Sequence, residues 1–282
     1  MSSVKAANLF DVKGLVAVVT GGIGLMLAKV LEENGAKVYI VGRRMDVLEK
    51  ASNGHHGNII PLQGDVSKKE DLLKIVDFIT KTDGFINALI VNHGILGPDL
   101  NDINPDQTLL EMQEVLWKAN VDDFTNTYRV NTSAVYFSTI AFLGLLEAGN
   151  KQGNVVQKSQ VIATASIGGL GRVARPGIAY VTSKAAVIHL MKVFATTFAN
   201  HDIRSNVIAP GLYPSETTEK KIIPNFAPDG VFPRALIPLQ RLGSIEDMAG
   251  AILYLTSQAG AFVNGNVIVT DGGSLSILPS SY

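Results

Sequence analysis

Short apolar runs recur along the chain and alternate with segments of helical spacing. The runs with strand character are residues 15–20, 37–41, 58–62, 86–91, 160–163, 205–208 and 266–270. Residues 68–80 and 179–200 are among the helical segments between them. Strands without a polar face that alternate with helices are typical of a parallel sheet covered on both sides. We therefore expect an α/β fold, a doubly wound parallel sheet of about seven strands with helices on both faces.

Length and composition fit one domain over residues 1–282. Hydrophobic residues make up 46% of the chain and charged residues 17%, which favours a compact core over disorder. The sequence has no repeat, low-complexity tract or interdomain linker. The least regular segments are 52–57, 97–107, 148–158 and 211–238, and we interpret them as loops, the last of them as a lid.

Several function classes are disfavoured by what the sequence lacks. The formal net charge is −1 and no Lys/Arg run is long, which argues against nucleic acid or an anionic membrane as a partner. Cysteine is absent, which excludes disulfides, thiolate catalysis and cysteine–zinc sites, and no His/Asp/Glu spacing indicates a metal site. No run of 18 apolar residues occurs and the start lacks a signal-peptide core, so we expect a soluble, cytoplasmic protein.

The stretch "VVTGGIGLMLAKVLEENGAKVYIVGRR" has the order strand, glycine turn, helix, strand. Such a turn lets the backbone approach a pyrophosphate, whose charge the amides of the next helix then hold. The turn residues are Thr20, Gly21, Gly22, Ile23 and Gly24. On its own this motif is weak, because a tight strand-to-helix connection has the same composition.

The second strand of this unit ends in Arg43 and Arg44, with no carboxylate before Asp46. A dinucleotide site usually places Asp or Glu there for the ribose 2′-hydroxyl, or Arg for a 2′-phosphate. Two guanidiniums suit a phosphate, so the sequence favours NADP(H) over NAD. The alternative is a pair of solvated arginines at a strand end.

The segment "ATASIGGLGRVARPGIAYVTSKAAVIHL" contains Ser166, Tyr180 and Lys184. Tyr180 and Lys184 are four residues apart and share a helical face. A phenol transfers protons at neutral pH only if its anion is stabilised, and a neighbouring ammonium can do this. Tyr-x-x-x-Lys is weak alone, and Ser166 alone could simply cap a turn at a strand end.

Taken in order, these motifs resemble the short-chain dehydrogenase/reductase family over nearly the whole chain, with its Rossmann-like fold. "VTGGIG" is similar to the family's nucleotide turn, "GDVS" with Asp65 and Val66 to its adenine contact, and "VNHGI" with Asn92 and Gly94 to its Asn-Ala-Gly stretch. "RVNTSAVYF" presents Asn131 at the catalytic asparagine, and "RSNVIAPGLYPSET" presents Pro210, Gly211 and Ser215 on the nicotinamide side. "VNGNVIVTDGG" resembles the closing strand.

The resemblance implies a mechanism and a cofactor, NADP(H). Tyr180 would give a proton to a carbonyl oxygen as hydride arrives, and Ser166 would orient that oxygen. Lys184 would bind the nicotinamide ribose and lower the pKa of the tyrosine, and Asn131 would support a water that links the lysine to solvent. The substrate would be a small-molecule ketone or alcohol, as in 3-oxoacyl-carrier-protein reductases and fungal-type reductases of secondary metabolism, and the assembly a homodimer or homotetramer.

The chain departs from the family pattern at the glycine turn. Relative to Thr-Gly-x-x-x-Gly-x-Gly three residues are missing, and His93 replaces the usual alanine. Either the first turn of the helix over 25–34 unwinds to rebuild a loop, or the grip on pyrophosphate weakens. The alternative function is therefore a non-redox protein on this scaffold, a binding or regulatory subunit or a cyclase-like enzyme.

Three further features are left with open interpretations. Residues 95–120 read as a loop followed by a helix, in which Trp117 lines the substrate mouth or packs at a subunit contact. Tyr213 borders the substrate or packs on the core, and His55 and His56 read as loop residues. Residues 120–149 and 179–200 are apolar on more than one face, which predicts burial against a second subunit.

Overall fold

The computed structural model describes residues 4–21, 24–53, 57–99, 103–104, 106–174, 176–215 and 218–282. Within these residues a seven-stranded sheet runs in the order β3-β2-β1-β4-β5-β6-β7, and all of its strand pairs are parallel. The strands are β1 (Val16–Thr20), β2 (Lys37–Gly42), β3 (Ile59–Gln63), β4 (Ala88–Val91), β5 (Gln160–Thr164), β6 (Arg204–Pro210) and β7 (Val267–Thr270). The expected doubly wound parallel sheet is confirmed.

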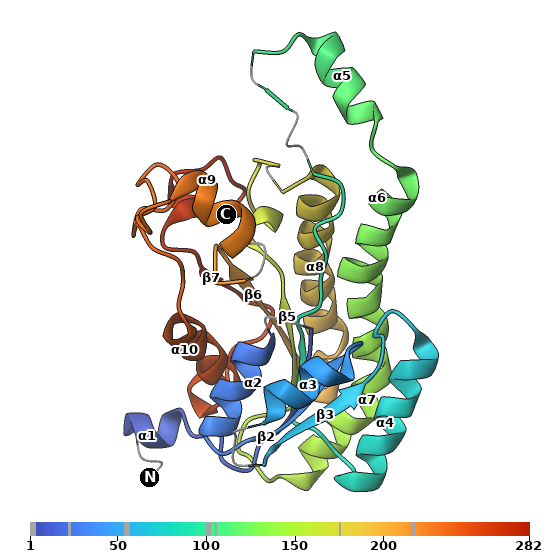
Figure 1. The fold of residues 1–282 in the computed structure, drawn as a ribbon. Coiled ribbons are helices and arrows are strands. Elements are labelled where there is room, and N and C mark those ends of the chain that lie inside the picture. Colours follow the sequence, from blue (N-terminus) through green and yellow to red (C-terminus); the bar gives the residue numbers. More distant parts are fainter. Residues whose placement is uncertain are drawn as a thin grey trace.

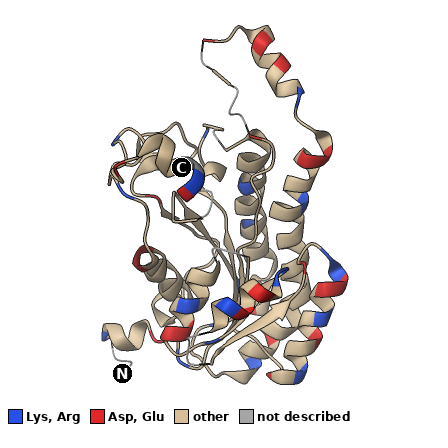
Figure 2. Cartoon of the chain, viewed as in Figure 1, with Lys and Arg blue, Asp and Glu red and all other residues tan. Residues whose placement is uncertain are grey.

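Helices cover both faces of the sheet (Figure 1). They are α1 (Ala6–Leu9), α2 (Gly24–Glu33), α3 (Met45–Ser52), α4 (Lys69–Thr82), α5 (Leu109–Trp117), α6 (Val121–Tyr128), α7 (Ala134–Gln152), α8 (Ile178–Thr197), α9 (Ile223–Phe226) and α10 (Ile245–Thr256). In the view of Figure 2, Lys and Arg alternate with Asp and Glu along α4. Charge of both signs is therefore mixed on this part of the surface.

Alternate residues of the buried strands supply two separate cores. In β1, Val16 and Val18 pack with residues of α4, α7 and α8, whereas Ala17 and Val19 pack with residues of α2 and α10. All five residues of β1 are buried, as are all five of β5. This two-sided burial explains why the strands read as continuous apolar runs.

Two helical stretches, Val121–Gln152 and Ile178–Thr197, are long and apolar enough by composition to span a membrane. Their apolar side chains include Phe142, Leu146 and Met191, which are buried against the sheet. Packing on the sheet accounts for part of the hydropathy of both stretches. Each also leaves apolar side chains partly exposed, among them Tyr136, Phe137, Ile140 and Val193.

Between β4 and α6 the chain forms an arm that ends in α5 and stands away from the body of the domain (Figure 1). The arm begins as the expected loop and continues as the expected helix, which starts with a capping box of Thr108 and Glu111. Trp117 at its end is 88% exposed. Its side chain therefore packs on neither core.

The irregular segments differ in part from expectation. The predicted loop over 148–158 begins inside α7, which continues to Gln152 and is capped by Gly153 at φ 64°. The segment 211–238 contains a π-helical turn, Thr218–Ile222, and α9. Its residues Ala227, Phe232 and Ile237 form a small apolar cluster of their own. Of the predicted loop 52–57, His55 and His56 lie outside the described residues.

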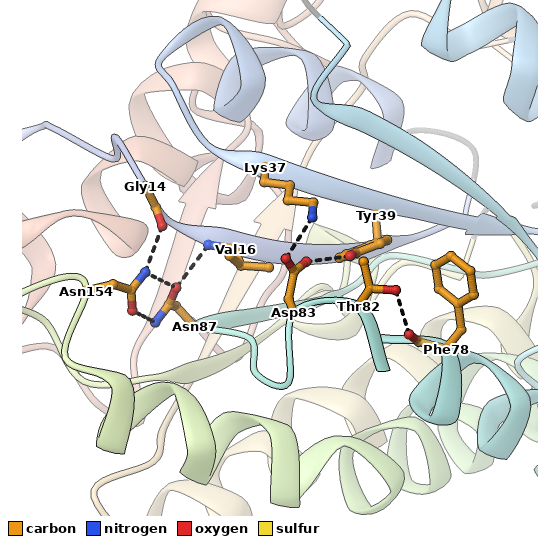
Figure 3. Close-up of polar contacts among 9 residues, drawn as sticks. All are labelled: Gly14, Val16, Lys37, Tyr39, Phe78, Thr82, Asp83, Asn87 and Asn154. Atoms are coloured by element: carbon orange, nitrogen blue, oxygen red, sulfur yellow. Dashed lines mark hydrogen bonds and ion pairs between the residues drawn. The ribbon is translucent and has the colours of Figure 1, made fainter. Parts of the chain in front are cut away.

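A polar network fastens the amino-terminal edge of the sheet, opposite the strand ends that carry the candidate site (Figure 3). The side-chain oxygen of Asn87 accepts a hydrogen bond from the Val16 amide at 2.9 Å, and its Nδ2 donates to Asn154 at 2.9 Å. Asn154 also donates to the carbonyl of Gly14 at 2.7 Å. Farther along this edge, Asp83 pairs with Lys37 at 2.7 Å and accepts from the Tyr39 hydroxyl.

We predict that Asn87→Ala lowers the free energy of unfolding by about 2 kcal/mol, because the buried Val16 amide loses its acceptor. Asn87 is 3% exposed, so water does not replace the lost oxygen without rearrangement. The measurement is urea unfolding followed by circular dichroism. The exposed Asn200→Ala serves as control and should change the value by less than about 0.5 kcal/mol; equal effects of the two substitutions would contradict the role of the network.

Candidate active site

The carboxyl ends of all seven strands lie at one edge of the sheet, because every pair is parallel. Strand order reverses between β1 and β4, since β1 leads outward to β2 and β3 while β4 leads to β5, β6 and β7. In open α/β sheets ligands bind in the crevice at such a reversal. The predicted site residues follow the ends of six of the strands, so the topology gathers them along this edge.

Ser166 and Tyr180 come together from β5 and α8. Ser166 follows the end of β5, and its hydroxyl accepts a hydrogen bond from the Gly168 amide at 3.0 Å, which caps a short 3₁₀ turn, Ile167–Gly169. The Tyr180 ring lies near the same hydroxyl, because a Cβ on Gly168 would lie 3.4 Å from Ser166 Oγ and 3.6 Å from Tyr180 Cε1. Ser166 thus caps its turn, as the simple interpretation expected, and also contacts the tyrosine.

Lys184 lies one helical turn after Tyr180 and is 4% exposed. Its Nζ donates a hydrogen bond to the carbonyl of Thr164 at 2.9 Å and lies 6.0 Å from the centre of the Tyr180 ring. Burial lowers the pKa of the lysine from 10.5 to about 8. The fold therefore holds an ammonium with little solvent beside the tyrosine.

The pKa of Tyr180 differs from the expectation that Lys184 lowers it. Burial raises the pKa of this tyrosine, and the hydrogen bond with Ser166 opposes the rise. Lys184 does not contribute to the lowering, because its Nζ bonds the Thr164 carbonyl instead of the phenol oxygen. Tyr180 consequently keeps its proton at neutral pH, the form that a proton donor needs.

Asn131 lies in a π-helical turn, Arg129–Ser133, that joins α6 to α7. Its side chain accepts from the Ile95 amide at 2.8 Å and donates to the Ile95 carbonyl and to Ser183 Oγ, both at 2.9 Å. These bonds tie the loop after β4 to α8. The side chain fixes the loop around Lys184, and such π turns occur frequently at functional sites.

The glycine turn is compact. Gly21 has φ 82°, and a Cβ on it would lie 2.7 Å from the Cα of His93, so only glycine fits there. Gly22 and Ile23 lie outside the described residues. Helix α2 runs Gly24–Glu33. The expectation that the first turn of the helix over 25–34 could unwind is therefore wrong; the helix is regular from Gly24 onward.

The residues expected at the adenosine end follow β2 and β3. Arg43 and Arg44 are exposed, and neither guanidinium forms an ion pair or a hydrogen bond with any described residue. Burial raises the pKa of Asp65, but hydrogen bonds from Ser67 and the charge of Arg43 outweigh it and leave the pKa lowered. Val66 packs against the core. The guanidiniums are thus available to an anion at this end of the edge.

At the end of β4, Asn92 and His93 are buried, 8% and 7% exposed. Among the described residues, Asn92 Oδ1, Asn92 Nδ2 and His93 Nε2 find no hydrogen-bond partner. A Cβ on Gly94 would lie 3.2 Å from Lys184 Nζ and 3.3 Å from Asn131 Oδ1, so glycine keeps the approach to the lysine open. Unpartnered polar atoms beside a glycine-lined edge fit a polar ligand that supplies the missing partners.

The remaining predicted residues lie after β6. A Cβ on Gly211 would lie 2.8 Å from the Cα of Asp271, so the chain after Pro210 passes close to the end of β7. Ser215 Oγ bonds Thr218 Oγ1 at 2.9 Å. Tyr213 is 5% exposed and packs in the core over Gly243, which favours the packing interpretation over contact with substrate.

Two groups that shape the site were not foreseen. The Thr164 carbonyl holds Lys184, and Ser183 holds Asn131. A backbone carbonyl has no signature in sequence, and a buried serine on an apolar helix is common. His93 had a signal, because it departs from the alanine of the family pattern, yet its buried and unpartnered nitrogen is visible only in the structure.

Comparison with known proteins agrees with this architecture. The sequence model for "Enoyl-(Acyl carrier protein) reductase" matches residues 17–274. The chain is 56% identical over 287 residues to the short-chain dehydrogenase/reductase PhomF of Diaporthe leptostromiformis, covering 99% of this chain and 98% of that protein. It is 30% identical to the 3-oxoacyl-[acyl-carrier-protein] reductase FabG of Thermotoga maritima, over 93% of this chain and 98% of that protein.

Solved structures show the same fold. The Pseudomonas aeruginosa RhlG/NADP active-site complex superposes with a TM-score of 0.77 at 27% identity, over 94% of this chain and 98% of that one. A gluconate 5-dehydrogenase from Burkholderia cenocepacia in complex with NADP and tartrate gives 0.77 at 26% identity, over 96% and 99%.

We predict that the burial of Lys184 makes the free energy of unfolding depend on pH. Below about pH 8 Lys184 is charged in the folded protein, and burial of this charge lowers the free energy of unfolding in full. Between about pH 8 and 10.5 the unfolded chain binds more protons than the folded protein. The free energy of unfolding therefore rises with pH in this range. Relative to Lys184→Met, the wild type should gain roughly 2.5 kcal/mol between pH 7 and 10. Urea unfolding of both proteins at each pH measures the gap, and a gap that is constant with pH would show that the lysine is not perturbed.

Proposed function

The chain belongs to the short-chain dehydrogenase/reductase family, and we propose that it is an NADPH-dependent reductase of a ketone, or in reverse a dehydrogenase of a secondary alcohol. The observation that carries the proposal is the buried ammonium of Lys184, 6.0 Å from the ring of Tyr180, with the Ser166 hydroxyl near the same tyrosine. Keeping a charge out of water is costly, and buried charges with shifted pKa values are concentrated at functional sites.

When bound, the nicotinamide supplies the hydride. The chain's own residues handle the proton. Tyr180, protonated at neutral pH, gives its hydroxyl proton to the carbonyl oxygen of the substrate, and Ser166 holds that oxygen by a second hydrogen bond. Lys184 would bind the nicotinamide ribose, because its ammonium is fixed one helical turn from Tyr180 at this edge. Asn131 positions the loop that borders the lysine.

NADP(H) is the cofactor that the residues fit best. Arg43 and Arg44 follow β2 with guanidiniums that pair with no described residue, at the place where a dinucleotide's adenosine ribose binds in this type of fold. Thr20, Gly21 and Gly24 border the strand reversal, and Tyr180 and Lys184 lie beside the end of β5 on its other side. The two solved structures compared above are complexes of those proteins with NADP.

Substrate and assembly complete the proposal. We expect a small to medium apolar ketone, enclosed by a lid over 211–238 whose Leu236 carbonyl accepts a hydrogen bond at 2.9 Å from Ser274, which follows β7. The single domain would self-associate as a cytoplasmic homodimer or homotetramer through the exposed apolar side chains of α7 and α8, including Tyr136 and Ile140.

We predict that Tyr180→Phe lowers the rate of NADPH-dependent ketone reduction by about a hundredfold or more, because the proton donor is lost while the ring still fills its place. The assay follows NADPH consumption over a panel of ketones. The exposed Tyr136→Phe is the matched control and should keep full activity. A Tyr180→Phe variant that keeps more than about a tenth of the rate would exclude the tyrosine as the acid.

We predict that Arg43→Ala weakens NADPH binding by about ten- to a hundredfold and leaves NADH binding nearly unchanged, because the guanidinium meets only the 2′-phosphate. Nicotinamide fluorescence on titration measures both affinities. Arg129→Ala, which removes an exposed arginine bonded to Asn126, is the control. Equal weakening of the two cofactors would contradict the assignment. A wild type that binds neither cofactor would favour the non-redox alternative.

A further inference from the structure

His93 occupies the strand reversal itself. It follows β4, which pairs with β1 at the point where the order changes direction. Its ring Nδ1 lies 2.9 Å from the Thr20 hydroxyl at the end of β1. The backbone of Gly21 passes so close to His93 that a Cβ on the glycine would lie 2.7 Å from its Cα. The imidazole therefore lies directly beside the shortened glycine turn.

The hydrogen bonds around Thr20 indicate which ring nitrogen carries the proton. The Thr20 hydroxyl accepts from the Asn92 amide at 3.1 Å, and its own hydrogen can be donated to His93 Nδ1. The proton of a neutral imidazole is then on Nε2. Burial, with the nearby charge of Lys184 adding to it, lowers the pKa of His93 to about 3, so the ring is neutral at physiological pH.

Nε2 is thus a buried N–H donor that meets no acceptor among the described residues, in a side chain 7% exposed. Native proteins rarely leave such a donor unpaired, and where they do a ligand often completes the bond. One residue earlier, Asn92 Oδ1 and Nδ2 are likewise buried and without a hydrogen-bond partner among the described residues. The charges that reach the ring belong to Lys184 and Asp65, which flank the edge on the α8 and β3 sides.

We propose that His93 is a cofactor-binding residue whose Nε2–H donates a hydrogen bond to an oxygen of the adenosine diphosphate half of NADPH. In this role the imidazole supplies one of the donors that the shortened turn no longer offers. The inference rests on the proposed function, because it assumes that the edge binds a dinucleotide. It concerns binding alone, since the ring contacts Thr20 at the end of β1 and is not hydrogen-bonded to Ser166, Tyr180 or Lys184.

Two isosteric substitutions separate the ring nitrogens. His93→Gln places an amide N–H near the position of Nε2, whereas His93→Asn keeps a polar group near Nδ1, facing Thr20, and lacks the reach to Nε2. Isothermal titration calorimetry with NADPH should show His93→Gln close to the wild type and His93→Asn weakened by about ten- to a hundredfold. Thermal unfolding without ligand checks that the two variants are equally folded.

Titration with adenosine 2′,5′-bisphosphate, which has the ribose and a 5′-phosphate but no pyrophosphate bridge, locates the acceptor. If His93→Asn weakens the binding of this ligand, the acceptor oxygen belongs to the ribose or the 5′-phosphate. If the substitution weakens only the binding of NADPH, the acceptor oxygen belongs to the pyrophosphate. Equal NADPH affinities of wild type, Gln and Asn variants, or equal losses in both variants, would overturn the role of Nε2. A wild type that binds NADPH without reducing any ketone would leave this inference intact and refute only the reductase; a wild type that binds no NADPH would refute both.

Discussion

The reversal of strand order between β1 and β4 is the constraint on which the rest of the structure depends. Because all the strands are parallel, their carboxyl ends share one edge, and the reversal falls between Thr20 and Asn92 on that edge. The candidate residues that follow six strand ends, and those of α8, are therefore distributed along it. The polar network around Asn87 stabilises the opposite, amino-terminal edge (Figure 3), whereas the carboxyl-terminal edge carries the candidate site.

A second constraint is electrostatic. Lys184 remains in the core through one backbone carbonyl, Thr164, and no carboxylate is paired with it among the described residues. An uncompensated ammonium destabilises the fold but is poorly screened, so it acts strongly on an anion that binds beside it. His93 is kept neutral in the same region. The edge therefore combines one fixed cation with neutral donors, an arrangement suited to a polyanionic ligand.

Much of the fold could be predicted from the sequence, because the five inner strands are buried on both faces and their apolar runs are local signals. The candidate residues after the strand ends were found through motif order. Features that depend on neighbours distant in sequence could not be predicted in this way. They are the carbonyl that holds Lys184, the raised pKa of Tyr180, the helical start of the loop predicted over 148–158, and the arm that exposes Trp117. The sequence left open how the glycine turn accommodates its three missing residues. The regular start of α2 at Gly24 shows that the helix does not unwind to lengthen the turn.

The central claim is that a nicotinamide dinucleotide binds across the β1–β4 reversal despite the short turn. Hydrogen–deuterium exchange of the protein with and without saturating NADPH tests it most directly. The account predicts slower exchange in the peptides that contain Thr20 to Gly24, Arg43 and Asn92 to Gly94, and unchanged exchange in α4 and in the arm that ends in α5. Unchanged exchange at the reversal, or protection confined to another face, would contradict it.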